Sequence, residues 1–198
     1  MPISSSWAEV TIGQYQAMTA IIAKNLSDIE QRLEFAELFV GDSCNDWTVS
    51  KLKEETDKLS FTNHLPSEKM VYGFEIDGKE YLINPLVQTL KAGQFIDLSE
   101  LLNNPAEINN QLHNIMAVIS VEKGKSYESY IENGKLFQSK LTMDKVYPVS
   151  VFFLQVGKRY LEIINGFLKK ETKKAERELK KLQKELGIKH STNTGAGV

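Results

Sequence analysis

The fold is organised around the stretch Gly93-Gln94-Phe95-Ile96-Asp97-Leu98, because a similar stretch, Gly13-Gln14-Tyr15-Gln16-Ala17-Met18, stands eighty positions earlier. In both copies the residues after the glycine have the apolar spacing of a helix. Similarity at a fixed offset is typical of a duplicated unit, although chance similarity between two helix starts would give the same short match. We expect the glycines to allow a close approach of the chain and the glutamines to tie each helix to the preceding segment. We also expect Tyr15 or Phe95 to be the first core residue.

Three helices are expected around the first copy, over residues 7–24, 29–40 and 50–59. Ser27-Asp28, with Glu30 close behind, is typical of the cap that begins a helix. The apolar residues of these segments, among them Ile22, Ile29 and Val49, are expected to face the core.

A β-hairpin is expected next, with strands over residues 70–76 and 79–83. Asp77-Gly78 separates the two runs, and a type I′ turn needs positive φ at both of its central residues. The second copy then predicts helices over residues 92–102 and 107–119, followed by a loop that contains Gly124 and Gly134. Partial burial is expected in this loop at four positions: Tyr127, Tyr130, Ile131 and Phe137.

A longer helix is expected over residues 146–167, with Pro148 tolerated in its first turn. It continues into a charged segment, residues 169–186, where apolar residues recur at coiled-coil-like spacing. The predicted fold class is therefore mainly α with a β-hairpin: two similar helical units joined by the hairpin, plus a long C-terminal helix. The expected divisions are residues 7–64, 68–85, 88–168, 169–190 and a flexible end at 191–198.

The charge is unevenly distributed, although the formal net charge is only -2. Residues 169–186 carry eight basic and four acidic side chains, and the remainder carries 16 and 22, a net charge of -6. Acidic residues interspersed with the lysines favour a solvated, salt-bridged helix over a nucleic-acid contact. The single cysteine, Cys44, excludes an intramolecular disulfide and fits a reducing compartment. The sequence contains no run of the roughly 18 apolar residues that a membrane-spanning helix needs, and we expect no secretory signal in it.

Catalytic chemistry is not indicated by the sequence. His64, His113 and His190 are far apart and have no companion ligand at metal-binding spacing. Cys44 stands in a predicted loop and is more typical of a structural thiol than of a nucleophile. The segment at Gly124-Lys125-Ser126 lacks the upstream glycine of a phosphate-binding loop. We therefore expect no enzyme, no cofactor and no metal.

The ordered set of motifs resembles a family of small proteins from tailed bacteriophages. The motifs are Thr11 to Tyr15, Ile76 to Tyr81, Leu90 to Asp97, Met116 to Ile119 with Gly124 to Tyr127, and Val151 to Leu154. Similar proteins, notably from phages of Bacteroides-type hosts, are described as tail-assembly-chaperone-like. The resemblance covers roughly residues 10–160. It implies a non-enzymatic protein that binds tail components in the host cytoplasm until the tail polymerises.

Two other functions stay open at this stage. The C-terminal extension lies outside the resemblance, and it would also suit a structural virion subunit, such as a portal-proximal connector, a ring or a tail component. A nucleic-acid-associated protein that uses residues 169–184 is the weaker alternative. Phage tail or connector proteins are the expected partners, a homo-oligomer is the other expected assembly, and no membrane is expected. The residues expected to bind a partner are Phe152, Phe153, Tyr160, Ile164, Leu179, Leu182 and Leu186.

Overall fold

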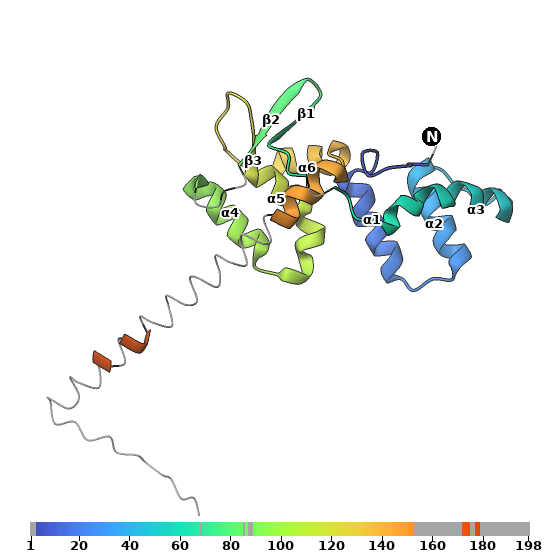
Figure 1. The fold of residues 1–198 in the computed structure, drawn as a ribbon, viewed down its shortest axis with the longest axis horizontal. Helices are drawn as coiled ribbons and strands as arrows, with labels where there is room; N and C mark the ends of the chain where they lie inside the picture. The colour runs from blue at the N-terminus through green and yellow to red at the C-terminus, as the bar shows by residue number, and fades with distance from the viewer. Residues whose placement is uncertain are drawn as a thin grey trace, which may run out of the picture. The chain divides into compact units, whose positions relative to one another are not determined.

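Three helices open the chain in the computed structural model: α1 (Ile12–Ala23), α2 (Asp28–Val40) and α3 (Val49–Asp57) (Figure 1). The structure describes residues 3–67, 69–84, 86, 89–152, 172–174 and 177–178. Each helix begins after a hydroxyl residue whose side chain accepts a hydrogen bond from the N–H three residues on, at Thr11, Ser27 and Thr48. The cap expected at Ser27 is confirmed, and it is a reciprocal capping box with Glu30.

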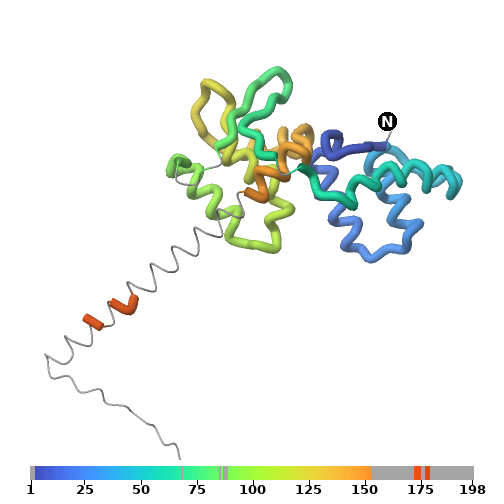
Figure 2. The backbone as a smooth tube through the Cα atoms, in the orientation of Figure 1, coloured from blue at the N-terminus to red at the C-terminus, as the bar shows by residue number. Residues whose placement is uncertain are grey.

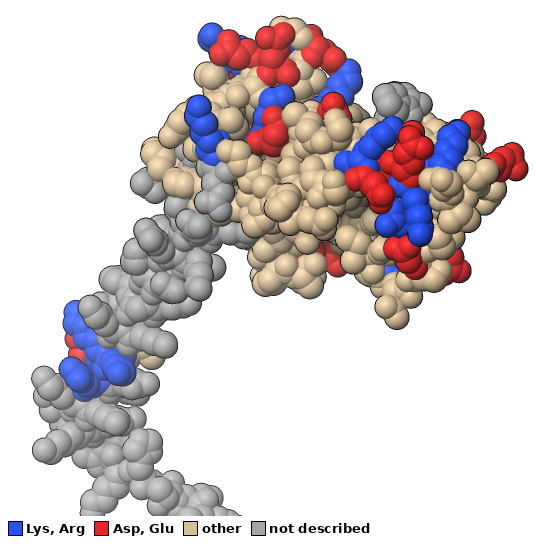
Figure 3. Space-filling view, turned by 45° about the vertical axis from the view of Figure 1, so that its right-hand side comes forward, with Lys and Arg blue, Asp and Glu red and all other residues tan. Residues whose placement is uncertain are grey.

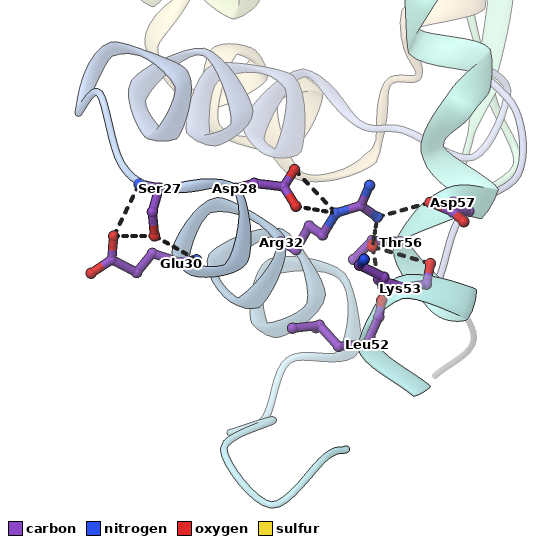
Figure 4. A network of polar contacts seen from close by, with 8 residues as sticks. All are labelled: Ser27, Asp28, Glu30, Arg32, Leu52, Lys53, Thr56 and Asp57. Carbon is purple, nitrogen blue, oxygen red and sulfur yellow. Dashed lines mark hydrogen bonds and ion pairs between the residues drawn. The ribbon is translucent and has the colours of Figure 1, made fainter. Parts of the chain in front are cut away.

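The contact between α2 and α3 includes a polar network centred on Arg32 (Figure 4). Its Nη1 donates to Thr56 Oγ1 and to Asp57 Oδ1, both at 2.8 Å, and its Nε donates to Asp28 Oδ2 at 3.1 Å. The buried Thr56 hydroxyl in turn donates to the carbonyl of Leu52 at 2.8 Å. The hydrogen bonds and charges of Asp57 and Asp28 raise the pKa of Arg32. Because both carboxylates are largely exposed, the network orients the two helices more than it stabilises them.

A short 3₁₀ helix, η1 (Lys58–Asn63), leads toward the hairpin of β1 (Gly73–Ile76) and β2 (Lys79–Ile83). The hairpin prediction is confirmed, since Asp77 and Gly78 have φ values of 53° and 74°, although β1 begins at Gly73 rather than at residue 70. A third strand that the sequence did not predict, β3 (Ser120–Glu122), pairs with β2 in antiparallel register. The fold is thus mainly helical with a three-stranded antiparallel sheet of order β1-β2-β3.

The second copy folds as two helices, α4 (Ala92–Leu102) and α5 (Ile108–Ile119), which pack on each other as α1 and α2 do. The short 3₁₀ helix η3 (Pro105–Glu107) connects them. Besides α4, α5 contacts α1, α6 (Ile131–Lys140) and β3 (Figure 2). Its last five residues, from Ile115 to Ile119, are all buried, so α5 is the central helix of the described chain.

The loop predicted around Gly134 is wrong, because residues 131–140 form α6. Gly134 and Phe137 are buried, and a Cβ at Gly134 would lie 2.3 Å from Asn114 Oδ1, so this glycine allows α6 to pack closely on α5. Phe137 packs edge-to-face on Phe74 and Tyr81, with ring centroids at 5.1 and 5.0 Å. Tyr127 and Tyr130 are half-buried as expected, whereas Ile131 is exposed and Phe137 is fully buried.

Residues 143–152 are helical, so the helix expected from residue 146 begins earlier. Pro148 consequently lies beyond the first turn, where its missing N–H removes the bond to the Asp144 carbonyl. Just before this helix the chain pairs with the segment ahead of α1. The Ile12 N–H donates to the Leu141 carbonyl at 2.9 Å, and the Met143 N–H donates to the Val10 carbonyl at 2.8 Å.

Several residues expected to contact the core are exposed instead: Ile22, Ile29, Val49 and Phe95. Ile22, for example, keeps 57 % of its surface exposed although its neighbour Ile21 is buried. The apolar spacing therefore located the helices that contain these residues but assigned too wide a face to the core, and α1 begins at Ile12 rather than at residue 7.

The chain divides into two units, residues 1–154 and residues 155–198. The first unit contains all the elements named above. In the second unit the described residues, 172–174 and 177–178, are helical and exposed. The remaining residues of the predicted C-terminal helix and the end at 191–198 lie outside the described residues.

Candidate functional site

Of the residues predicted to bind a partner, Phe152 alone is described, and it is half-buried near the end of the helical residues 143–152. The other six, Phe153, Tyr160, Ile164, Leu179, Leu182 and Leu186, lie outside the described residues. The candidate site is therefore built from the described part of the chain.

The groups with intrinsic reactivity have structural surroundings. Cys44 is buried, and this burial raises the pKa of its thiol, which favours the unreactive protonated form. The His64 carbonyl accepts a bond from Trp7 Nε1 at 2.8 Å, and its ring is exposed. Within the described residues, no group of three His, Cys, Asp or Glu side chains is arranged to hold a metal ion. The same residues include no helix of the length and apolarity needed to span a membrane.

A hollow of about 740 Å³ lies beside β3 and is the candidate site. We call it the β3 hollow. It is lined by β3, by Lys79 of β2, by the loop from Lys125 to Ser129 and by the first turn of α6. Figure 2 shows this loop next to the β1–β2 turn. An ion pair at 2.7 Å between Glu80 of β2 and Lys123, directly after β3, joins the two segments. Its volume falls in the range of ligand-binding pockets.

The register of β3 determines which backbone groups face the β3 hollow. Asn84 N–H donates to the Ile119 carbonyl and Lys123 N–H donates to the Glu80 carbonyl, both at 2.8 Å. Because hydrogen-bonded pairs alternate in an antiparallel ladder, Val121 directs its N–H and carbonyl toward β2. The carbonyl of Ser120 and the N–H of Glu122 therefore point away from β2, to the outer edge of the sheet. No hydrogen bond joins either group to another residue in the described part of the chain.

One side chain that lines the β3 hollow also has a polar atom without a hydrogen-bond partner among the described residues. Ser120 is 1 % exposed, on the face of the sheet shared with the core, and its Oγ has no hydrogen-bond partner among the described residues. A buried hydroxyl without a partner costs free energy comparable to a lost hydrogen bond. Ser120 lies among the residues that line the β3 hollow.

Charged side chains also line the β3 hollow. Glu122 pairs with Lys125 at 2.9 Å and lies 3.9 Å from Lys79, and the hydrogen bond and charge of Glu122 raise the pKa of Lys125. Glu128 and Glu132 also line the β3 hollow, and neither forms an ion pair with another described residue. The five charged side chains that line it therefore sum to -1.

The loop wall is held by a contact with the second copy of the repeated stretch. The Tyr127 hydroxyl donates to Asp97 Oδ2, and burial together with this partner raises the pKa of Tyr127. The first copy has Ala17 at the position of Asp97, so this anchor belongs to the second copy alone.

The sequence did not predict the β3 hollow, because it predicted neither β3 nor α6. Gly134, Phe137 and Leu141 recur at spacings of three and four and are all buried, which is the available sequence signal for α6. A strand as short as Ser120–Glu122 has no comparable signal, since its identity depends on pairing with β2.

Charges elsewhere on the described surface are mixed. On the face drawn in Figure 3, basic and acidic side chains of the first unit lie next to one another, and a broad stretch between them has few charges. Such mixing is typical of a solvated surface and provides no extended basic patch on that face for a phosphate backbone.

Comparison with known proteins identifies no relative. No family model matches the sequence, no curated protein matches it, and no solved structure matches the fold.

Proposed function

We propose that this chain is a non-enzymatic bacteriophage assembly protein that binds a partner polypeptide, as tail assembly chaperones do. The resemblance of residues 10–160 to such proteins supplies the phage context. The structural observation that supports polypeptide binding is the hollow of about 740 Å³ beside β3, where the N–H of the half-buried Glu122 points away from β2 to the outer edge of the sheet. A strand edge with unpaired backbone groups is a common surface for recognising another chain.

The partner in this proposal is a phage tail or connector protein, and binding takes place in the host cytoplasm during assembly. A chaperone in this sense covers part of a tail component until that component enters the particle. The function needs shape and hydrogen bonding but no reacting group, in keeping with the structural surroundings of Cys44 and His64. The competing function is that of a permanent virion subunit, because a chaperone and a virion subunit would bind the same tail or connector proteins.

Two measurements test the proposal. The full chain, tagged and expressed together with the tail and connector proteins of its phage, should retain one of them through purification. Mass spectrometry of purified virions should then find the chain absent or far below the abundance of the tail proteins. Many copies per particle would assign it to the virion structure instead. Retention of none of these proteins would remove the proposed function.

A further inference from the structure

We propose that two molecules of this chain associate through the outer face of α4, as a two-fold dimer in which the two α4 helices lie antiparallel. The inner side of α4, where Gln94 and Leu98 are buried, packs on α5 (Figure 1). The outer side carries four exposed, uncharged residues at helical spacing, which we call the α4 face: Ala92, Phe95, Ile96 and Ser99. Because the occupant is a second molecule of this chain, the dimer holds or fails independently of any phage partner.

The first copy of the repeat shows the equivalent face covered. Ile12 and Gln16 stand there at the positions of Ala92 and Ile96. Ile12 is fully buried, and Gln16 forms hydrogen bonds with residues of α5 and α6. Ile96 is more apolar than Gln16, yet it keeps 57 % of its surface exposed. The more apolar residue at the more exposed of two equivalent positions indicates a surface that an assembly covers.

The α4 face is complementary to itself when its direction is reversed. With the two-fold axis between Phe95 and Ile96, Phe95 of each protomer lies opposite Ile96 of the other, so the bulky side chains meet at the centre. The small residues Ala92 and Ser99 then lie opposite each other on either side of the axis, where they let the helices approach closely. Such a contact uses the same surface on both protomers and therefore stops at two molecules.

The charges at the ends of α4 favour the antiparallel direction. Lys91 at the N-cap and Glu100 in the last turn are both exposed. An antiparallel pair brings Lys91 of each protomer to the same end as Glu100 of the other, whereas a parallel pair would bring like charges together. The contact is short, because the 11 residues of α4 span about 16 Å. We therefore expect a weak dimer, with a Kd on the order of 0.1 mM.

Sedimentation equilibrium of the full chain tests the dimer. Between about 10 µM and about 1 mM, a range that brackets the expected Kd, the mass should rise from monomer toward dimer. Ile96→Glu places a carboxylate beside the two-fold axis in each protomer and should raise the Kd about tenfold or more. Ile22→Glu is the matched control, since Ile22 is also 57 % exposed but lies on α1, and it should leave the Kd unchanged. A monomer at every concentration, or equal effects of the two variants, would overturn the inference.

Charge reversal tests the direction of the helices. Lys91→Glu and Glu100→Lys should each raise the Kd about threefold or more at low salt, because each puts like charges together at both ends of the pair. Both changes suit the helix dipole, so the fold is retained. A mixture of the two variants should dimerise at least as readily as wild type, since opposite charges then meet at both ends. Single variants that associate like wild type, or a mixture no better than they are, would contradict the antiparallel arrangement.

Cysteine cross-linking tests the register and also traps a weak dimer. Ala92→Cys chains mixed with Ser99→Cys chains place two thiols opposite each other, whereas two Ala92→Cys chains hold theirs about 10 Å apart along the helix. Oxidation should therefore link the mixture several times faster than either variant alone. Cys44 is buried and does not take part. Equal rates of cross-linking would show that the proposed register is wrong.

Discussion

The two helix starts at Gln14 and Gln94 have similar sequences but different surroundings. Gln14 is half-buried, its side-chain Oε1 accepts from the Thr11 N–H at 3.0 Å, and the Thr11 hydroxyl accepts from the Gln14 backbone N–H at 3.2 Å. Gln94 is 3 % exposed and accepts the Lys91 N–H at 3.2 Å, but lysine has no acceptor to return the bond. The amide of Gln94 instead donates to the Val118 carbonyl at 2.6 Å. Gln14 thus caps the start of α1 alone, whereas Gln94 caps the start of α4 and also bonds to the last turn of α5.

The bond to Val118 explains why Gln94 is buried and Phe95 is not. Val118 stands in the last turn of α5, where helical carbonyls lack an intrahelical donor. An unpaired carbonyl at this fully buried position would be costly. The inward position at the start of α4 is therefore taken by an amide, and Phe95 keeps 41 % of its surface exposed.

Replacing the glutamines tests this difference most strongly. Gln94→Ala should lower the free energy of unfolding by about 2 kcal/mol, because it leaves a buried carbonyl unpaired and opens a cap. Gln14→Ala should cost only about 0.5–1 kcal/mol, since water can replace the lost bond at its half-buried site. Urea unfolding followed by circular dichroism would measure both. Gln94→Met, which keeps the side-chain volume but has no amide, should behave like Gln94→Ala, and equal losses at Gln14 and Gln94 would contradict the comparison.

The glycines next to them differ in the opposite sense. A Cβ at Gly13 would lie 2.9 Å from the backbone carbonyl of Gln138, whereas a Cβ at Gly93 meets nothing within 4 Å. The close approach expected for both glycines therefore holds in the first copy alone. Gly13→Ala should lower the free energy of unfolding by about 1–2 kcal/mol through this clash. Gly93→Ala should raise it by about 0.5 kcal/mol through better helix propensity. Thermal unfolding of the pair would refute the distinction if both variants shifted the midpoint in the same direction.

The smallest expected effect concerns Gln16, which the second copy replaces with the exposed Ile96. Gln16 Nε2 lies 3.1 Å from His113 Nδ1 and donates to the carbonyls of Asn109 and Asn110, and its Oε1 accepts from Gln138 Nε2. An amide nitrogen only donates, so a hydrogen bond from Gln16 Nε2 to His113 Nδ1 requires this ring nitrogen to be unprotonated.

Burial lowers the pKa of His113 in the folded chain. Neutral His113 therefore makes its full contribution to the free energy of unfolding above the ordinary histidine pKa of about 6.5. Below that pH the unfolded chain binds a proton that the folded chain does not, so stability falls. His113→Leu should therefore make the urea midpoint vary less between about pH 7.5 and about pH 5.5 than in wild type. An unchanged pH slope would show that the contact does not depend on the charge of His113.

Local signals in the sequence predicted the parts of the fold that depend on neighbouring residues. Ser27 with Glu30 specifies a cap within one turn, and Asp77-Gly78 specifies a turn through its own φ values. Gln14 and Gln94 do tie their helices to the preceding segment, as expected. Each of these features involves residues at most three positions apart.

The features that the sequence did not predict depend on distant partners. The second bond of Gln94 reaches 24 positions along the chain, to Val118. β3 forms because it pairs with β2. The buried side of α6 is determined by Phe74 and Tyr81, on which Phe137 packs. The β3 hollow combines these elements, so no local pattern could indicate it. Apolar spacing likewise could not show that Ile22 and Val49 face outward, because that choice depends on which helices pack against them.

The pairing of Thr11 with Thr142 has a consequence for the time course of synthesis. The two residues are 131 positions apart, and the bonds beside them, Ile12 to Leu141 and Met143 to Val10, hold the start of α1. At about 5–20 residues per second, the second partner is made roughly 7 to 26 seconds after the first. During that interval the segment ahead of α1 has unpaired backbone groups, and α1 lacks α5 and α6, against which it finally packs.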